Sequence, residues 1–241
     1  TRLAHRHGVD FGQVTLGNGS NDVLVLLAET FLTPEHEAVY SQYAFAVYPI
    51  AVQATGARAR VAAAHSPDDP MPLGHDPQAI LAAIGPKTRI VFLANPNNPT
   101  GTWLTGPEVQ ALLRAIPPEV IIVLDEAYHE YSIGAGVPDA TAWLATYPNL
   151  VVTRTFSKAF GLAGLRVGYA LSHPDVAELL NRVRQPFNVS VVGLAAAAAA
   201  LEDQEHVAAT ITLNRQGLRR LREGLGALGL KVLPSSANFV L

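Results

Sequence analysis

Four short, mostly apolar runs, each followed at once by polar residues, constrain the fold of this chain more than any other feature. They cover residues 14–16, 89–94, 120–124 and 150–152. The run 120–124 is apolar at every position, as expected for a parallel strand that is buried on both faces. Helical periodicity occupies the segments between the runs. We therefore predict an α/β fold with three layers, α/β/α, in which helices cover both faces of a mainly parallel sheet.

Weaker signals complete the expected order of elements. Further strands are predicted at residues 38–41, 166–171, 231–233 and 238–241, and helices at residues 1–7, 23–31, 43–55, 77–84, 174–183, 191–201 and 205–228. Ser20, Asp76, Thr105 and Ser172 are the predicted N-caps. The alanine-rich segment 191–201 is interpreted as a buried helix, because its eleven residues are too few for a membrane span, which takes about 20.

A change from alternating strands and helices to long helices near residue 185 marks a predicted domain boundary. We expect residues 1–185 to form a large cofactor-binding domain. Residues 186–241 are expected to hold hinge helices and the start of a smaller C-terminal α+β domain. Because the chain opens inside a helical pattern and closes inside an apolar one, we expect it to be an internal piece of a longer protein.

Composition argues against several classes of partner. A net charge of −3 with scattered basic residues offers no field for nucleic acid or anionic lipid. The absence of cysteine predicts neither disulfides nor a thiolate metal site, and we expect a cytoplasmic protein. No metal site is predicted, because His129 and Glu130 lack a metal-binding spacing, and His65 and His75 are expected at the surface.

Lys158 is the residue around which the candidate site is organised. It is one of three lysines against fourteen arginines, and it follows a strand among hydroxyl residues and glycines. A partly desolvated amine is a candidate nucleophile toward carbonyls, a role that a guanidinium cannot fill. Gly161, Gly164 and Gly168 are expected to let the backbone pass close to a ligand. The alternative for Lys158 is an ordinary surface lysine.

Two segments offer groups for a phosphate. Arg166 provides a planar donor fork beside the hydroxyls of Thr155 and Ser157. Ser20 and Asn21 open a helix after a glycine-rich turn, where free N–H groups and the positive end of the helix dipole attract anions. An ordinary capped turn is the alternative, and the GxGxxG pattern of dinucleotide sites is incomplete. A Schiff-base amine with a phosphate clamp indicates pyridoxal phosphate as cofactor.

Further residues provide groups for a cofactor ring. Asp125 ends a buried strand, where a carboxylate needs a cation such as a pyridinium nitrogen, and capping of the next turn is the alternative. Tyr128, three residues later, can point to the same pocket. Asn98 belongs to the rigid NPNNPTG loop after another strand. Phe45 and Tyr48 can stack on a ring, although core packing is the commoner fate of such aromatics.

The candidate residues all follow strand ends, where ligands bind in parallel sheets. The motifs NPNNPTG, DEAY and SKAFGLAGLRVGY make the chain resemble the fold type I pyridoxal-phosphate aminotransferases of class I/II over nearly its whole length. Within that family, GNGSNDVL, MPLGHD and RQPFNV are most similar to the histidinol-phosphate aminotransferases. The resemblance implies a pyridoxal 5'-phosphate enzyme with the fold predicted above.

The resemblance also implies a role for each site residue. Lys158 forms the Schiff base with the cofactor and moves a proton between substrate and cofactor, and Asp125 keeps the ring nitrogen protonated. Tyr128 and Asn98 bind the ring hydroxyl. Phe45 stacks on the ring, where relatives often have tyrosine. The residues that hold the cofactor phosphate are Ser20, Asn21, Thr155, Ser157 and Arg166.

The implied reaction transfers an amino group from L-histidinol phosphate to 2-oxoglutarate, giving imidazole acetol phosphate and glutamate, in histidine biosynthesis. The resemblance further implies a homodimer with a shared active site, in which segments outside this sequence contact the substrate. Three alternatives stay open: an aromatic amino-acid aminotransferase, a threonine-phosphate decarboxylase-like enzyme and a non-catalytic aminotransferase-like regulatory module.

Overall fold

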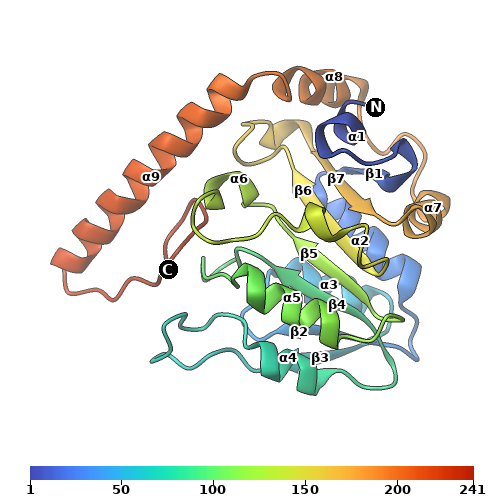
Figure 1. Cartoon of the computed structure of the whole chain (residues 1–241), viewed down its shortest axis with the longest axis horizontal. Coiled ribbons are helices and arrows are strands. Elements are labelled where there is room, and N and C mark those ends of the chain that lie inside the picture. Colours follow the sequence, from blue (N-terminus) through green and yellow to red (C-terminus); the bar gives the residue numbers. More distant parts are fainter.

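A seven-stranded sheet crosses the centre of the molecule (Figure 1). The structure is a computed structural model that describes all residues, 1–241. The strands are β1 (Val14–Asn18), β2 (Glu37–Ser41), β3 (Arg58–Ala62), β4 (Thr88–Ala94), β5 (Ile121–Asp125), β6 (Leu150–Thr155) and β7 (Val167–Ser172). They lie in the order β1-β7-β6-β5-β4-β2-β3, and only β7 runs antiparallel to its neighbours. The other six strands therefore end at one common edge of the sheet.

Helices cover both faces of this sheet. They are α1 (Arg2–His7), α2 (Ser20–Phe31), α3 (Val47–Ala54), α4 (Pro77–Ala83), α5 (Gly106–Ala115), α6 (His129–Ser132), α7 (Pro174–Val183), α8 (Val191–Ala200) and α9 (Gln204–Ala227), with 3-10 helices η1 (Phe11–Gln13), η2 (Ala140–Trp143) and η3 (Ala163–Leu165). Side chains of α2, α3 and α7 pack into one buried apolar cluster, and those of α4 and α5 pack into another on the opposite face. The predicted three-layer α/β/α fold is confirmed.

Side chains of β5 alternate between the two apolar clusters. Val123 packs in the cluster that includes α2 and α3, whereas Leu124 packs in the cluster that includes α5. Burial on both sides explains why this strand is apolar at every position. Because successive side chains of an extended chain point to opposite faces, Asp125 and Glu126 also face opposite sides of the sheet.

Two of the four predicted N-caps, Asp76 and Thr105, are confirmed. The Asp76 side chain accepts hydrogen bonds from two N–H groups in the first turn of α4, and Thr105 forms the predicted capping box at α5. Ser20 is the first helical residue of α2 rather than its N-cap. The cap is Gly19, whose φ of 83° lies outside the helical region.

Two other expectations are wrong in detail, and one strand was missed. His173 rather than Ser172 caps α7, because a His173 ring nitrogen accepts the hydrogen bond of the Asp175 N–H at 3.3 Å. The helix predicted from residue 43 begins only at Val47. Strand β3 was not predicted, since four of its five residues are exposed at the edge of the sheet and show no apolar pattern.

The C-terminal part differs most from expectation. Helix α8 is not buried: Val191 and Val192 are 81% and 67% exposed, because the helix contacts β7 along one narrow stripe. Residues 231–241 form no strand. A single backbone hydrogen bond, from Leu233 N–H to the Leu241 carbonyl, links the two predicted strands, and neither pairs with the sheet. The domain boundary near residue 185 stays a prediction.

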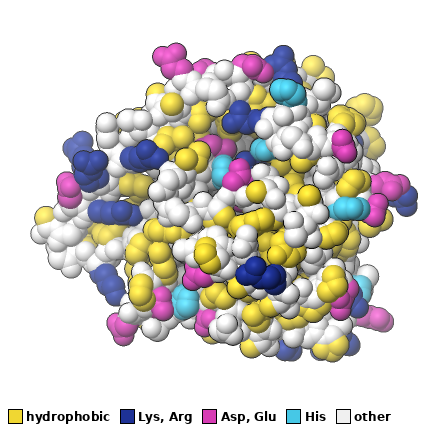
Figure 2. Space-filling view, viewed as in Figure 1, with side chains coloured by type: hydrophobic (Ala, Val, Ile, Leu, Met, Phe, Trp, Pro, Cys, Tyr) yellow, Lys and Arg dark blue, Asp and Glu magenta, His cyan; other side chains and the backbone are white.

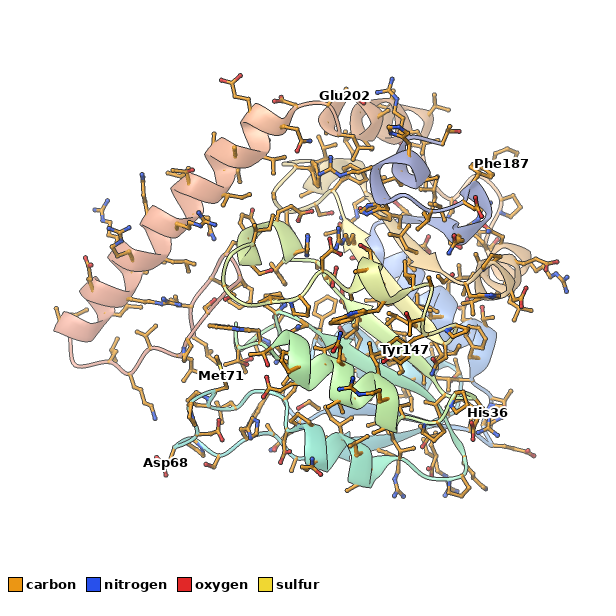
Figure 3. The ribbon with its side chains drawn as sticks, viewed as in Figure 1. His36, Asp68, Met71, Tyr147, Phe187 and Glu202 are labelled. Atoms are coloured by element: carbon orange, nitrogen blue, oxygen red, sulfur yellow. The ribbon has the colours of Figure 1, made fainter.

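The surface of the C-terminal part is partly charged and partly apolar. Basic side chains gather over α9, at the left of Figure 2, where Arg215, Arg219, Arg220 and Arg222 belong to this helix. Phe187, between α7 and α8, is 97% exposed and points away from the molecule (Figure 3). The longest helix, α9, is too polar to be a membrane span, and no other helix qualifies.

Candidate active site

A cavity at the common edge of the sheet brings together ten of the side chains proposed from the sequence, and of those proposed for the cofactor ring only Tyr48 does not line it. The cavity has a volume of about 140 Å³ and opens to solvent. Its lining consists of Ser20, Asn21, Phe45, Ala94, Pro96, Asn98, Asp125, Ala127, Tyr128, Thr155, Ser157, Lys158 and Arg166. These residues come from separate stretches of the chain, as expected where several strands end at one edge.

Asp125, the last residue of β5, presents a carboxylate at the floor of the cavity. It is 4% exposed. Its Oδ2 accepts a hydrogen bond from the Tyr48 hydroxyl at 2.9 Å, and its Oδ1 accepts one from the Thr153 hydroxyl at 3.0 Å. No lysine, arginine or histidine forms an ion pair with it. Burial raises the pKa of this carboxyl, and the hydrogen bonds from Tyr48 and Thr153 oppose that effect.

The hydrogen bond between Tyr48 and Asp125 was not expected from the sequence, which predicted that the Tyr48 ring could stack on a cofactor. Its ring is fully buried and stacks on Phe92, with centroids 5.0 Å apart, so it does not line the cavity. Burial and the nearby Asp125 carboxylate raise the pKa of its hydroxyl well above the usual value, so the hydroxyl remains a proton donor. Phe45 stands edge-on to Tyr48 at 5.9 Å and faces the cavity. The three-residue spacing of the two aromatics was the only local signal.

Tyr128 connects two of the predicted groups. Asn98 Nδ2 donates a hydrogen bond to the Tyr128 hydroxyl at 3.0 Å. The Lys158 Nζ lies 5.2 Å from the centroid of the Tyr128 ring, a distance at which an ammonium is attracted to the ring face. Burial raises the pKa of the Tyr128 hydroxyl, and the hydrogen bond from Asn98 opposes this. The amide, phenol and amine thus share one wall of the cavity.

The three asparagines of the NPNNPTG loop have different tasks. Asn95 holds the loop closed, because its side chain accepts from the Leu104 N–H at 2.8 Å and donates to the Leu104 carbonyl at 3.1 Å. Asn97 donates to the Tyr43 carbonyl at 2.7 Å. Both Asn-Pro peptide bonds in this loop are cis. Only Asn98 faces the cavity, so two amides build the loop that presents the third.

The first turn of α2 forms the opposite end of the cavity. Ser20 and Asn21 line it, and no side chain caps the free N–H groups of this turn. Gly168 of β7 lies directly against the turn, and a Cβ on it would overlap the backbone nitrogen of Ser20. The sequence predicted that Gly168 makes room for a ligand. It makes room instead for the helix end, which is in turn aimed at the cavity.

Arg166 approaches the same helix end from the other side. A Cβ on Gly19 would overlap its guanidinium. Its Nη1 donates to the Ser157 hydroxyl at 3.2 Å and to the Ala163 carbonyl at 3.0 Å. The Thr155 hydroxyl accepts a hydrogen bond from the Ser157 N–H at 3.1 Å, so it shapes the turn as well as lining the cavity. A guanidinium, hydroxyls and free helix N–H groups therefore converge, a combination suited to a phosphate.

His75 lies in a different place from the one that the sequence predicted. No group of three or more His, Cys, Asp or Glu side chains is arranged to hold a metal ion. His75, expected at the surface, is buried, and its Nε2 lies 2.8 Å from the Ala94 carbonyl at the end of β4. Burial lowers its pKa to about 4. It is therefore neutral near pH 7, and it supports a backbone position that lines the cavity.

Comparison with known proteins identifies the family. Residues 1–241 match the family described as aminotransferase class I and II. The chain belongs to this family. It is 56% identical over 238 residues to histidinol-phosphate aminotransferase 2 of Pseudomonas fluorescens and 55% identical over 239 residues to that of Pseudomonas aeruginosa. Each alignment covers 99% of this chain and 63% of the relative.

Solved structures give the same family. The crystal structure of histidinol-phosphate aminotransferase from Sinorhizobium meliloti in complex with pyridoxal-5'-phosphate superposes with a TM-score of 0.91 at 33% identity. That match covers 99% of this chain and 63% of the other chain. This aminotransferase chain thus spans about 63% of the length of the two Pseudomonas relatives and of the Sinorhizobium meliloti chain.

Proposed function

We propose that this aminotransferase chain is part of a pyridoxal 5'-phosphate enzyme that transfers the amino group of L-histidinol phosphate to 2-oxoglutarate. The products are imidazole acetol phosphate and glutamate, and the reaction belongs to histidine biosynthesis in the cytoplasm. One observation carries the proposal: an amine, an unpaired buried carboxylate and a helix N-terminus line one cavity. The names of the relatives at 55–56% identity support the substrate.

The groups around the cavity fit this cofactor. Asp125 is a buried carboxylate without a cation, and a protonated pyridine nitrogen would supply one. The first turn of α2, which has no side-chain cap, would receive the phosphate together with Arg166 and the Ser157 hydroxyl. The Lys158 side-chain amine makes no ion pair or hydrogen bond and lies over the Tyr128 ring, so it is available for a carbonyl. When bound, the cofactor supplies an electron sink for the carbanion formed at the substrate Cα.

The side chains of this chain would bind and orient the cofactor and move the protons. Lys158 would hold the cofactor covalently and then carry the proton from the substrate Cα. Asp125, oriented by its two hydroxyl donors, would keep the proton on the ring nitrogen. Tyr128 and Asn98 would bind the ring hydroxyl, and Phe45 would cover the ring. Ser20, Asn21, Thr155, Ser157 and Arg166 would bind the phosphate.

Recognition of the substrate involves more of the enzyme than this chain. Because the chain spans 63% of its relatives' length, we propose that segments outside it meet the substrate phosphate, and that the enzyme is a homodimer with a shared active site. A bidentate guanidinium contact with that phosphate would contribute about 3 kcal/mol, or roughly a hundredfold in efficiency.

Steady-state kinetics on the full-length protein test the substrate. We expect kcat/KM for histidinol phosphate to exceed that for unphosphorylated histidinol by about a hundredfold or more. A preference for phenylalanine would assign the enzyme to the aromatic aminotransferases. Decarboxylation of threonine phosphate would identify a lyase, and no turnover with any donor would indicate a regulatory module.

Covalent mapping tests the cofactor. Borohydride reduction of the protein with pyridoxal 5'-phosphate, followed by peptide mass spectrometry, should place the pyridoxyl group on Lys158. Lys87 and Lys231 are the other lysines of the chain and serve as internal controls. A label on either of them, with none on Lys158, would contradict the proposed role.

A further inference from the structure

A buried ion pair lies beside the candidate active site without lining it. Arg154 Nε and Nη2 both donate to Glu126 Oε2, at 2.9 and 2.6 Å. Glu126 Oε1 accepts the backbone N–H of Ala140 at 3.0 Å, and Arg154 Nη2 also donates to Asp139 Oδ1 at 2.7 Å. Glu126 and Arg154 are only 2% and 5% exposed. Both carboxylate oxygens of Glu126 and two nitrogens of the Arg154 guanidinium are thus used within the fold.

The place of this pair in the chain connects it to the site residues. Glu126 follows Asp125, and Arg154 lies between Thr153, which donates to Asp125, and Thr155, which lines the cavity. The parallel ladder of β5 and β6 ends at Asp125 and Thr153, and the Glu126 N–H donates to the Thr153 carbonyl at 2.9 Å. The ion pair therefore joins the two strands at their last rung, on the opposite face from the cavity.

Stability alone is a poor explanation for such a pair. The free energy needed to remove two charges from water is about as large as the free energy gained from their attraction. Replacing a buried ion pair by apolar residues of similar volume therefore often leaves the stability of the fold unchanged or raises it. Burial lowers the pKa of the Arg154 guanidinium, but the Glu126 and Asp139 carboxylates outweigh this and raise it above its usual value. Burial raises the pKa of the Glu126 carboxyl, and Arg154 and the Ala140 N–H oppose that effect. What the pair does provide is a fixed geometry, because Arg154 donates to both Glu126 and Asp139, and Glu126 also accepts from the Ala140 N–H.

We infer that Glu126 and Arg154 are positioning residues, which lock the ends of β5 and β6 so that Asp125 and Lys158 face the cavity in a fixed relation. Arg154 precedes Lys158 by four residues, and the turn between them is tied by the bond from Ser157 N–H to the Thr155 hydroxyl. A shift of β6 against β5 would move the amine and the carboxylate apart. This inference rests on the proposed function, since it assumes that both groups hold one ligand.

The test uses the full-length protein with both partners replaced, Glu126→Met with Arg154→Met. The double variant should fold with a modest loss of thermal stability, because no buried charge of the pair is left alone, although the half-exposed Asp139 loses its cation and the Ala140 N–H its acceptor. It should nevertheless bind pyridoxal 5'-phosphate at least about tenfold more weakly, because the ends of β5 and β6 would no longer hold Asp125 and Lys158 in a fixed relation. The pH midpoint of the visible absorption of the bound cofactor should also move. A matched control is Glu178→Met with Arg182→Met, which removes an exposed ion pair on α7 and should change neither reading.

A second measurement separates this inference from the proposed function. In cofactor-free protein, 13C NMR of the Asp125 carboxyl reports the environment that Glu126 and Arg154 are inferred to set, whether or not the cofactor assignment holds. We expect the titration midpoint of Asp125 to shift in the double variant. If wild type fails to bind the cofactor, the proposed function is wrong and this titration alone decides the inference. A folded double variant with unchanged affinity and an unchanged midpoint would overturn the inference.

A second variant covers the case in which the double variant does not fold. Arg154→Lys keeps the positive charge but loses the planar guanidinium, and it is expected to show the same shifts in cofactor affinity and in the Asp125 midpoint. If neither quantity changes in Arg154→Lys, the inference is likewise overturned.

Discussion

The Tyr48 hydroxyl donates a hydrogen bond to Asp125 across 2.9 Å, and both side chains are buried. The two residues are 77 positions apart, on α3 and β5. Because a buried carboxylate is destabilised unless its oxygens accept hydrogen bonds, this hydroxyl is part of what allows Asp125 to be charged at the candidate site.

Replacing Tyr48 by phenylalanine tests this contact. The Tyr48→Phe variant should unfold about 1–3 kcal/mol more easily near pH 7, the usual cost of removing a hydrogen bond from a buried charged group. Urea denaturation measures this. Tyr40→Phe is the matched control, since the Tyr40 hydroxyl makes no hydrogen bond, and it should change stability little. Equal effects of the two substitutions would mean that the bond to Asp125 is unimportant.

Asp125→Asn should keep the fold but remove the proposed activity. The amide can still meet the hydroxyls of Tyr48 and Thr153, but it cannot stabilise a protonated ring nitrogen. We expect pyridoxal 5'-phosphate still to bind and kcat to fall by roughly a thousandfold, the scale seen when preorganised charge is removed. Asp76→Asn, which preserves an N-cap outside the cavity, is the control and should retain activity. Turnover of Asp125→Asn near the wild-type rate would make Asp125 a purely structural residue.

Gly168→Ala should weaken phosphate binding by moving the end of α2. The added methyl would overlap backbone at Ser20, which cannot rotate away as a side chain would. We expect a loss of stability of about 1–3 kcal/mol and a lower affinity for both the cofactor and inorganic phosphate. Calorimetric titration with each ligand measures the affinities. Gly164→Ala, where a Cβ meets nothing within 4 Å, is the matched control. Wild-type affinity in Gly168→Ala would show that the site tolerates a displaced helix end.

His75 should make the fold sensitive to acid. Its pKa is lowered to about 4 by burial, so the unfolded chain binds this proton more readily than the folded one. Its contribution is fully present above the unfolded pKa of about 6.5 and is lost as the pH falls toward 4. For this one residue we expect a loss of about 2 kcal/mol in unfolding free energy between about pH 7.5 and pH 5.

Urea midpoints at the two pH values measure this dependence. His75→Gln, which keeps a donor for the Ala94 carbonyl, should show a shallower dependence than wild type. His5→Gln, at an exposed position of α1, should behave like wild type. If His75→Gln loses stability with acid as steeply as wild type, other groups account for the effect.

Local pattern was enough to predict most of the fold and which of the proposed side chains line one cavity. The ends of β4, β5 and β6 are marked by an abrupt change from apolar to polar residues, so Asn98, Asp125 and Lys158 were assigned to one edge. The predictions for individual elements were wrong or missing where the exposure of a segment does not follow from its amino-acid composition. The small side chains of α8 are mostly exposed, the polar strand β3 gave no signal, and residues 231–241 have an apolar pattern but no strand to pair with.

The sequence by itself determined which chemical groups stand at the strand ends, because caps, strand ends and glycine turns are set by neighbouring residues. Only the tertiary structure decided how these groups are held. Tyr48 reaches Asp125 across 77 positions, and Arg154 reaches Glu126 across 28. Gly168 fits against the first turn of α2, although it lies far from α2 in the sequence. Such contacts depend on which strands become neighbours, and the order of strands in a sheet follows from the packing of the whole chain rather than from any local stretch.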